Sequence, residues 1–147
     1  MTATRSTRQE HEYQRLLAID RDDTTKECPF CKMKEGHPQF VRQERYFKVI
    51  RNRTPYSLWD EQVVLDHLMI VPIKHTAKVS DLGGEAAEEY VRLLGEYDER
   101  GYCMFARALN ASVRSVVHQH THLMKLDGKK RRFLFMVRKP WYFRLSR

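Results

Sequence analysis

Hydrophobic residues recur at helical spacing in two stretches of the chain. Tyr13, Leu16 and Leu17 follow Ser6-Thr7-Arg8-Gln9, which resembles a capping box, and together they predict a helix from about Thr7 to Ile19. A second amphipathic stripe predicts a helix from Glu85 to Arg100, and its apolar members are Ala87, Tyr90, Val91, Leu94 and Tyr97. Glycines stand on both sides of this second stretch, as helix ends favour.

Shorter apolar runs, several of them rich in β-branched and aromatic residues, predict strands. The runs are Tyr46–Arg51, Leu65–Val71, Tyr102–Leu109, Val116–Leu126 and Arg132–Lys139. Their order is two strands, the second helix and then three strands, which suits an α+β domain built on an antiparallel sheet. The stretch from Pro55 to Asp60 predicts a turn or loop between the first two strands.

The composition fits one domain with a core of its own, since 41% of the 147 residues are hydrophobic and 31% are charged. We expect a single domain over 1–147, with an N-terminal helical extension over 1–27 and a basic, aromatic C-terminal segment over 127–147. The chain has no apolar run of about 18 residues and begins without the hydrophobic stretch of a secretory signal. We therefore expect a cytoplasmic protein with no membrane partner.

Positive charge is concentrated towards the C-terminus. The net charge is +8, and from Lys125 to Arg147 nine Lys or Arg stand against one acid, Asp127. Aromatic residues are interleaved with this charge, so the segment has the composition to bind nucleic acid by charge and stacking. A closing strand over Phe133–Val137 with solvated basic neighbours explains the same composition, and both interpretations stay open.

Three of the seven histidines, His118, His120 and His122, follow one another at a spacing of two in the run Ser115–Met124. If this run is a strand, their side chains line one face of a sheet about 6.5–7 Å apart. Packing alone is a poor explanation, because buried imidazoles need a partner for each ring nitrogen. The run predicts a functional site, and the alternatives are an exposed basic strand or a chance metal-binding patch.

The cysteines point to metal or redox chemistry. Of the three, Cys28 and Cys31 form a Cys-x-x-Cys pair, whereas Cys103 lies in an apolar run and is expected in the core. A disulfide scaffold does not suit the cytoplasm, and no βαβ pattern of the kind found around redox pairs flanks the two cysteines. His11 and His37 are expected at the surface, although His37 could act as a metal ligand if its loop folds back.

Two motifs resemble the histidine-triad (HIT) family of nucleotide-binding proteins. One is His118-Gln119-His120-Thr121-His122, with Ser115 three residues before it. The other is Asp66-His67-Leu68-Met69-Ile70-Val71-Pro72-Ile73-Lys74-His75, a histidine that opens a strand ending in Pro, a basic residue and His. The resemblance covers about residues 28 to 126. It implies a HIT-like α+β fold, an antiparallel sheet of about five strands with two main helices, and a homodimer.

The resemblance also implies a role for each histidine near the phosphate. His120 would be the nucleophile that attacks the α-phosphate of a nucleotide and forms a covalent nucleotidyl-histidine, as a neutral imidazole can near pH 7. Its other ring nitrogen would donate to a backbone carbonyl. His122 and Ser115 would contact the phosphate or the leaving group, and His67 would support the site from an adjacent strand.

The resemblance further implies that the nucleoside lies near the loop from Asn52 to Asp60. The residues that we expect to contact the nucleotide are Asn52, Asp60, Asn110 and Arg114, and Tyr56 or Trp59 could stack on the base. The family has a Gly-rich segment before the serine, where backbone amides come close to the phosphate. This chain has Arg114 there, so the charge of Arg114 would replace those amides as the phosphate contact. Gln119 and Thr121 stand where the family is usually apolar, which predicts a wetter back of the sheet.

A zinc-binding subgroup of the family joins its Cys-x-x-Cys to two histidines. Carried over, this gives a structural zinc on Cys28, Cys31, His75 and His118. The expected function is hydrolysis or nucleotidyl transfer on a nucleoside phosphate derivative. One alternative is a nucleotide- or nucleic-acid-binding module with little turnover, with an aprataxin-like enzyme for adenylylated nucleic acid as the intermediate case. Another is a zinc-stabilised interaction protein with no nucleotide role.

Overall fold

A computed structural model describes residues 3–22, 27–111, 114–131, 136–138 and 142–144. Five antiparallel strands form the main part of its sheet, in the order β2 (Phe40–Gln43), β3 (Phe47–Arg51), β5 (Gln62–Pro72), β7 (Thr121–Leu126) and β6 (Tyr102–Ala106). Two short strands, β1 (Ala3–Thr4) and β4 (Leu58–Trp59), extend the sheet beside the first residues of β5. Strands β8 (Met136–Arg138) and β9 (Tyr142–Arg144) pair separately.

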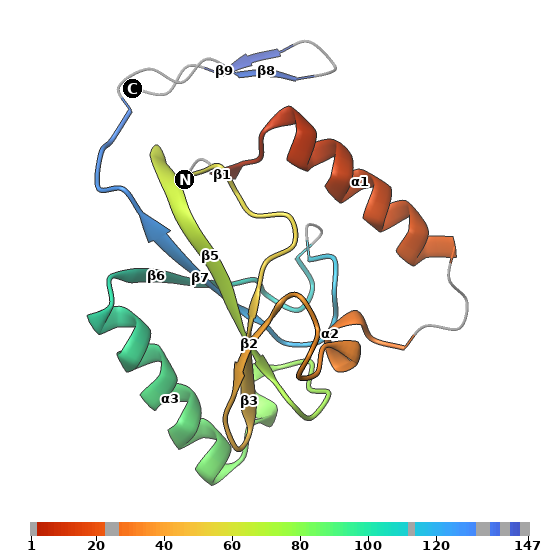
Figure 1. Cartoon of the computed structure of the whole chain (residues 1–147), viewed down its shortest axis with the longest axis vertical. Coiled ribbons are helices and arrows are strands. Elements are labelled where there is room, and N and C mark those ends of the chain that lie inside the picture. The colour runs from red at the N-terminus through yellow and green to blue at the C-terminus, as the bar shows by residue number, and fades with distance from the viewer. Residues whose placement is uncertain (1–2, 23–26, 112–113, 132–135, 139–141, 145–147) are drawn as a thin grey trace.

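Helices lie on both sides of the sheet (Figure 1). One side carries α3 (Gly84–Glu99), preceded by the 3₁₀ helix η1 (Val79–Asp81), and the other carries α1 (Thr7–Asp22) and the short α2 (Pro29–Lys32). The predicted capping box starts α1, since the Ser6 amide donates to Gln9 Oε1 at 3.1 Å and the Gln9 amide donates to Ser6 Oγ at 3.4 Å. The predicted α+β class, with its antiparallel sheet and two main helices, is confirmed.

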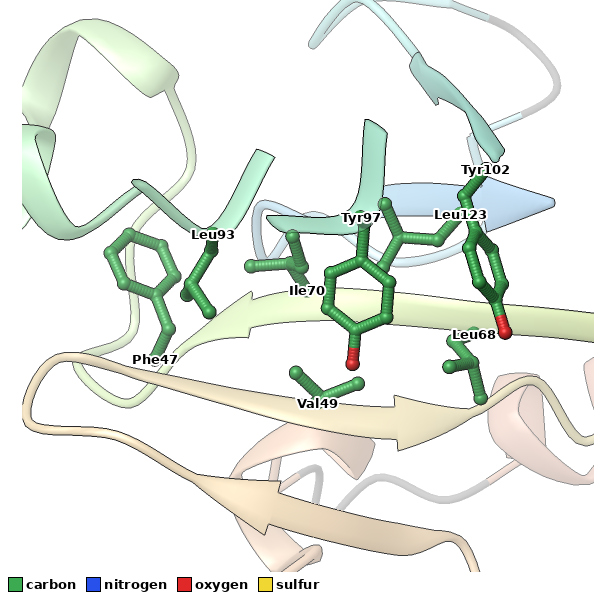
Figure 2. Packing of buried hydrophobic residues seen from close by; sticks show 8 residues of the cluster. All are labelled: Phe47, Val49, Leu68, Ile70, Leu93, Tyr97, Tyr102 and Leu123. Carbon is green, nitrogen blue, oxygen red and sulfur yellow. The ribbon is translucent and has the colours of Figure 1, made fainter. Parts of the chain in front are cut away.

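The largest core lies between α3 and the sheet (Figure 2). Leu93 and Tyr97 reach from α3 onto the strands, where Val49 and Ile70 meet them. Successive side chains of a strand point to opposite faces of the sheet, so the residues next to Val49 and Ile70 in sequence face the other side. There Ile50, Met69 and Val71 pack against Phe30 and Met33 of the α2 region. Strands β3 and β5 are therefore covered on both faces, which explains their nearly continuous apolar runs.

The predicted strand Val116–Leu126 is wrong over residues 116–120, because β7 begins only at Thr121. Before that point, the guanidinium of Arg114 donates to the carbonyls of Val116 and Val117, at 3.1 and 2.6 Å. In a strand, such carbonyls would accept hydrogen bonds from the neighbouring strand. The chain therefore bends ahead of β7, and only His122 of the three histidines lies in a strand.

Two burial predictions also need correction. Cys103 is exposed, because it points to the face of edge strand β6 opposite to buried Tyr102, where α3 gives no cover. Thr121 and Gln119 are buried, so the back of the sheet is not wet there. Thr121 Oγ1 lies 2.6 Å from the hydroxyl of Tyr90 on α3, and this hydrogen bond lets a polar side chain enter the core.

The structure describes only part of the C-terminal segment, so only part of what was predicted there can be compared with it. Of the predicted strand Arg132–Lys139, residues 136–138 form β8, and the rest lies outside the described residues. Ten of the 21 residues of the basic, aromatic segment 127–147, which was proposed to bind nucleic acid, lie outside the described residues. Within the described residues, no helix is long and apolar enough to span a membrane.

Candidate active site and metal-binding group

A cavity of about 180 Å³ opens on the α1 and α2 side of the sheet, and the predicted catalytic residues Ser115, His120 and His122 line it. Asn52 reaches the same cavity from the loop after β3. A larger hollow of about 510 Å³ beside Tyr46 and the start of α3 contains none of the predicted site residues. The smaller cavity is therefore the candidate active site.

The backbone carbonyl of His118 orients the ring of His120. His120 Nδ1 lies 2.8 Å from the carbonyl oxygen of His118, so this nitrogen carries the proton and donates it. Burial lowers the pKa of His120 below its ordinary value, and the charges of Arg114 and Arg107 act in the same direction. At neutral pH the ring is therefore uncharged, and its Nε2 lone pair accepts no hydrogen bond from the part of the chain that the structure describes. The His120 side chain lines the cavity.

A chain of hydrogen bonds sets the proton positions of His67 and His122. The backbone amide of Tyr56 donates to His67 Nδ1 at 3.2 Å, so the proton of His67 sits on Nε2. That nitrogen lies 2.9 Å from His122 Nδ1 and donates to it, which leaves the proton of His122 on Nε2. Asn52 Nδ2 lies 3.2 Å from His67 Nε2, but both atoms carry hydrogens, so this contact is not a hydrogen bond.

Both of these buried rings are neutral at pH 7. Burial lowers the pKa of His67 to about 3, with the charge of Arg5 acting in the same direction. Burial also lowers the pKa of His122 well below its ordinary value, helped by His67, His120 and nearby arginines. His122 can therefore donate one hydrogen bond from Nε2 without carrying a net charge.

Four side chains converge beside the active site in a geometry that suits a metal ion. They are Cys28, Cys31, His75 and His118, whose ligand atoms all lie within 4.8 Å of one another. His118 Nε2 lies 3.0 Å from the carbonyl of Pro72 and donates to it, so its Nδ1 lone pair is free to face the two sulfurs. His37 is not a member of the group, and its Nδ1 accepts from the amide of Gln39.

The distances in this group match those of a tetrahedral zinc site. His118 Nδ1 lies 3.4 Å from Cys28 Sγ and 3.6 Å from Cys31 Sγ, and His75 Nδ1 lies 3.5 Å from Cys31 Sγ. Zn–S bonds of about 2.3 Å and Zn–N bonds of about 2.0–2.1 Å at a tetrahedral angle hold sulfur and nitrogen ligands about 3.5–3.6 Å apart. The four residues therefore fit a tetrahedral metal ion.

The metal-binding group and the active site share residues and contacts. His118 offers its ring to the group, while its carbonyl accepts the proton of His120 Nδ1. Phe30, which lies between the two cysteines, presents its ring to His120 edge-on with centroids 5.0 Å apart. Lys48 holds α2 in place, because its buried ammonium donates to the carbonyls of Phe30 and Met33 at 2.6 Å each. The two sites are therefore joined through His118 and Phe30.

The structure does not bring every predicted nucleotide contact to the cavity. Asp60 is exposed in a turn with a positive φ of 50°, and Asn110 is exposed in the turn after β6. Arg114 donates to carbonyls of Val117 and Ala77 among others, so its guanidinium supports the bend before β7. Trp59 is buried against the Tyr56 and Phe105 rings, and of the two candidate stacking residues only Tyr56 lines the cavity.

Sequence reasoning missed several residues that line the cavity. Arg107 follows β6 and donates to the Tyr56 hydroxyl at 2.8 Å, but no pattern in the sequence distinguishes it from other arginines. Arg5 and Tyr13 come from the N-terminal segment, which was predicted as a helix but not as part of the site. Phe30 could have been found, because it lies inside the cysteine motif.

Solved structures share this fold. No protein-family model and no curated protein matches the sequence. A HIT family hydrolase from Legionella pneumophila Philadelphia 1 is 25% identical, with a TM-score of 0.51 over 71% of this chain and 95% of that one. One from Clostridium thermocellum is 21% identical, with a TM-score of 0.53 over 72% and 96% of the two chains. The chain therefore has the fold of HIT family hydrolases, and part of it extends beyond theirs.

Proposed function

We propose that this chain is a histidine-triad enzyme that hydrolyses, or transfers the nucleotidyl group of, a nucleoside phosphate derivative. The observation that carries the proposal is a neutral His120 with a free Nε2 lone pair in a cavity lined by cationic side chains. Arg5, Arg53 and Arg107 line this cavity, and its lining includes no Asp or Glu among the described residues. Such a site favours an anion next to a nucleophile.

The reaction proceeds in two displacements. His120 Nε2 attacks the α-phosphorus, a P–N bond forms, and the bond from phosphorus to the leaving group breaks with its electron pair going to the leaving group. The His118 carbonyl stabilises the positive charge that develops on the ring, because it accepts from Nδ1. His122 Nε2 and Ser115 donate hydrogen bonds to the phosphate oxygens. Water then attacks the phosphorus and releases the nucleoside monophosphate and neutral His120.

Zinc is the metal that we propose for Cys28, Cys31, His75 and His118. The ion would join the two cysteines before β2 to His75 in the loop after β5 and to His118, whose carbonyl orients His120. Burial, together with the neighbouring Cys28, raises the pKa of the Cys31 thiol, so metal uptake is expected to release protons. Its role is structural. The homodimer and the cytoplasmic location implied by the family resemblance belong to the same proposal.

The test uses the p-nitrophenyl ester of adenosine monophosphate, whose leaving group absorbs light when released. A protein that forms a nucleotidyl-histidine is expected to give a burst of nitrophenolate close to one equivalent per site before steady turnover. His120→Gln should abolish both phases, whereas His11→Gln, at an exposed position of α1, should change neither. A His120→Gln protein that keeps the burst would contradict the proposed nucleophile. The guanosine, cytidine and uridine esters test the base.

A further inference from the structure

Strand β3 buries a charged side chain, Lys48, in an otherwise apolar stretch. Lys48 is 4% exposed, and the residues on either side of it, Phe47 and Val49, belong to the core against α3. Its own side chain points to the other face of the sheet, towards α2. An ammonium group that leaves water loses free energy unless polar partners replace its hydration. In the described parts of the chain no carboxylate forms an ion pair with Lys48, and its partners are backbone carbonyls.

These carbonyls belong to the turn that carries the two cysteines. Lys48 Nζ donates to the carbonyls of Phe30 and Met33 at 2.6 Å each, one on either side of Cys31. The turn is short, since α2 has four residues, and the amide of Cys31 closes it by donating to the Cys28 carbonyl at 2.9 Å. A single helical turn is not stable by itself in water. Lys48 therefore ties a weak element to the sheet.

The two histidines of the metal-binding group are held unequally. His118 is buried, and its Nε2 donates to the Pro72 carbonyl at 3.0 Å. His75 is exposed in the loop after β5, where its Nδ1 lies 3.5 Å from Cys31 Sγ. Pro72 and Lys48 thus hold three of the four ligands against the sheet, and His75 completes the set from the exposed side.

We propose that Lys48 is a positioning residue of the metal-binding group, whose ammonium holds the cysteine turn in the geometry that a tetrahedral ion needs and so sets how tightly the ion is bound. This inference rests on the proposed function, of which the zinc is a part. A divalent ion that replaces two thiol protons leaves the formal charge of the group unchanged. The charge of Lys48 therefore has little effect on the affinity, which depends on the order that its hydrogen bonds impose on the turn.

The substitution Lys48→Met separates this role from a role in the stability of the sheet. Methionine has a similar length and no charge, so it keeps the packing and removes the cost of burying an ammonium group. The carbonyls of Phe30 and Met33, however, lose the donor that joins them to β3. The sheet is expected to stay folded while the cysteine turn opens more often.

The test measures zinc affinity by competition with a chromophoric chelator, and the rate of zinc loss to excess EDTA. In Lys48→Met, the dissociation constant for zinc should rise at least tenfold and zinc loss should be faster, because residues that orient metal ligands have effects of about 10- to 100-fold. The matched control is Lys34→Met, which removes an exposed cation close enough for its charge to act on Lys48. This control should bind zinc as the native protein does.

Amide hydrogen exchange of the zinc-free proteins tests the order of the turn directly. In the native protein the Cys31 amide should exchange at least tenfold more slowly than in an unstructured peptide. Lys48→Met should remove this protection and leave that of Ile70 in β5 unchanged, whereas a loss of overall stability would lower both. This measurement on the native protein needs no variant, so it tests the inference even if Lys48→Met does not fold.

Three results would overturn the inference. They are an equal zinc affinity of Lys48→Met and the native protein, an equal loss of affinity in Lys34→Met, and an unprotected Cys31 amide in the zinc-free native protein. If zinc binds and the nitrophenyl ester gives its burst through His120 while one of these results is found, only the role of Lys48 is wrong. A native protein that binds no zinc overturns the proposed zinc site together with this inference.

Discussion

Replacing Phe30 by leucine tests whether the cysteine motif positions the nucleophile. Phe30 is 6% exposed, packs with Ile50 and Met69, and meets the His120 ring edge-on at 5.0 Å. Leucine keeps most of the packed volume, so we expect the free energy of unfolding to fall by about 1 kcal/mol. The aromatic contact with His120 contributes about 0.5–1.5 kcal/mol and is lost. If it holds the ring in its reactive orientation, the burst rate falls about two- to tenfold.

The matched control is Phe47→Leu. Phe47 is 1% exposed but lies on the α3 side of the sheet, where it stacks on Tyr90 at 5.4 Å. Its loss should destabilise the fold to a similar degree and leave the burst rate unchanged. Urea unfolding gives the stability of both variants, and stopped-flow absorbance with the nitrophenyl ester gives the burst rate per active site. Equal burst rates in the two variants would refute the idea that Phe30 orients His120.

Three further predictions follow from the site. Because the pKa of His67 falls from 6.5 to about 3 on folding, the unfolded chain binds more protons below pH 6.5, and the free energy of unfolding should drop by about 2 kcal/mol from this residue between neutral pH and pH 5. Urea titrations at several pH values measure this change. If the free energy of unfolding of His67→Gln depends on pH as steeply as that of the native protein, the prediction is contradicted. The purified protein should contain about one zinc per chain by elemental analysis, and a chelator should lower its Tm. His75→Ala should weaken zinc binding and His37→Ala should not, so equal zinc contents in the two variants would count against the site. Ser115→Ala should lower kcat for the ester on the order of a hundredfold, since it removes a phosphate donor, and an unchanged kcat would remove Ser115 from the mechanism.

The elements with strong periodicity were predictable from the sequence. The capping box at Ser6 and the apolar stripe before Gly101 placed α1 and α3 within a few residues of their observed bounds. The four residues that could hold a metal ion were also predicted together, because the family resemblance joined Cys28 and Cys31 to two histidines that the structure brings close to them. These predictions rest on local spacing or on a motif that carries its own geometry.

The residues that sequence reasoning misplaced depend on contacts between distant segments. A regular strand through His118 was a fair reading of the alternation, but the guanidinium of Arg114 takes the carbonyls that the strand would have used. The cavity contacts of Arg5 and Arg107 follow from the approach of both residues to Tyr56, from sequence positions far apart. Neither residue lies in a motif. Spacing along the chain contains no signal for such contacts.

The central claim is that His120 Nε2 forms a bond to phosphorus. The most direct measurement is mass spectrometry of protein mixed with the nitrophenyl ester of adenosine monophosphate and quenched with base within the burst. The account predicts a mass increase equal to one adenylyl group, located by peptide fragmentation on His120 and missing from His120→Gln. An adduct on another residue, or complete hydrolysis with no adduct at any quench time, would contradict it.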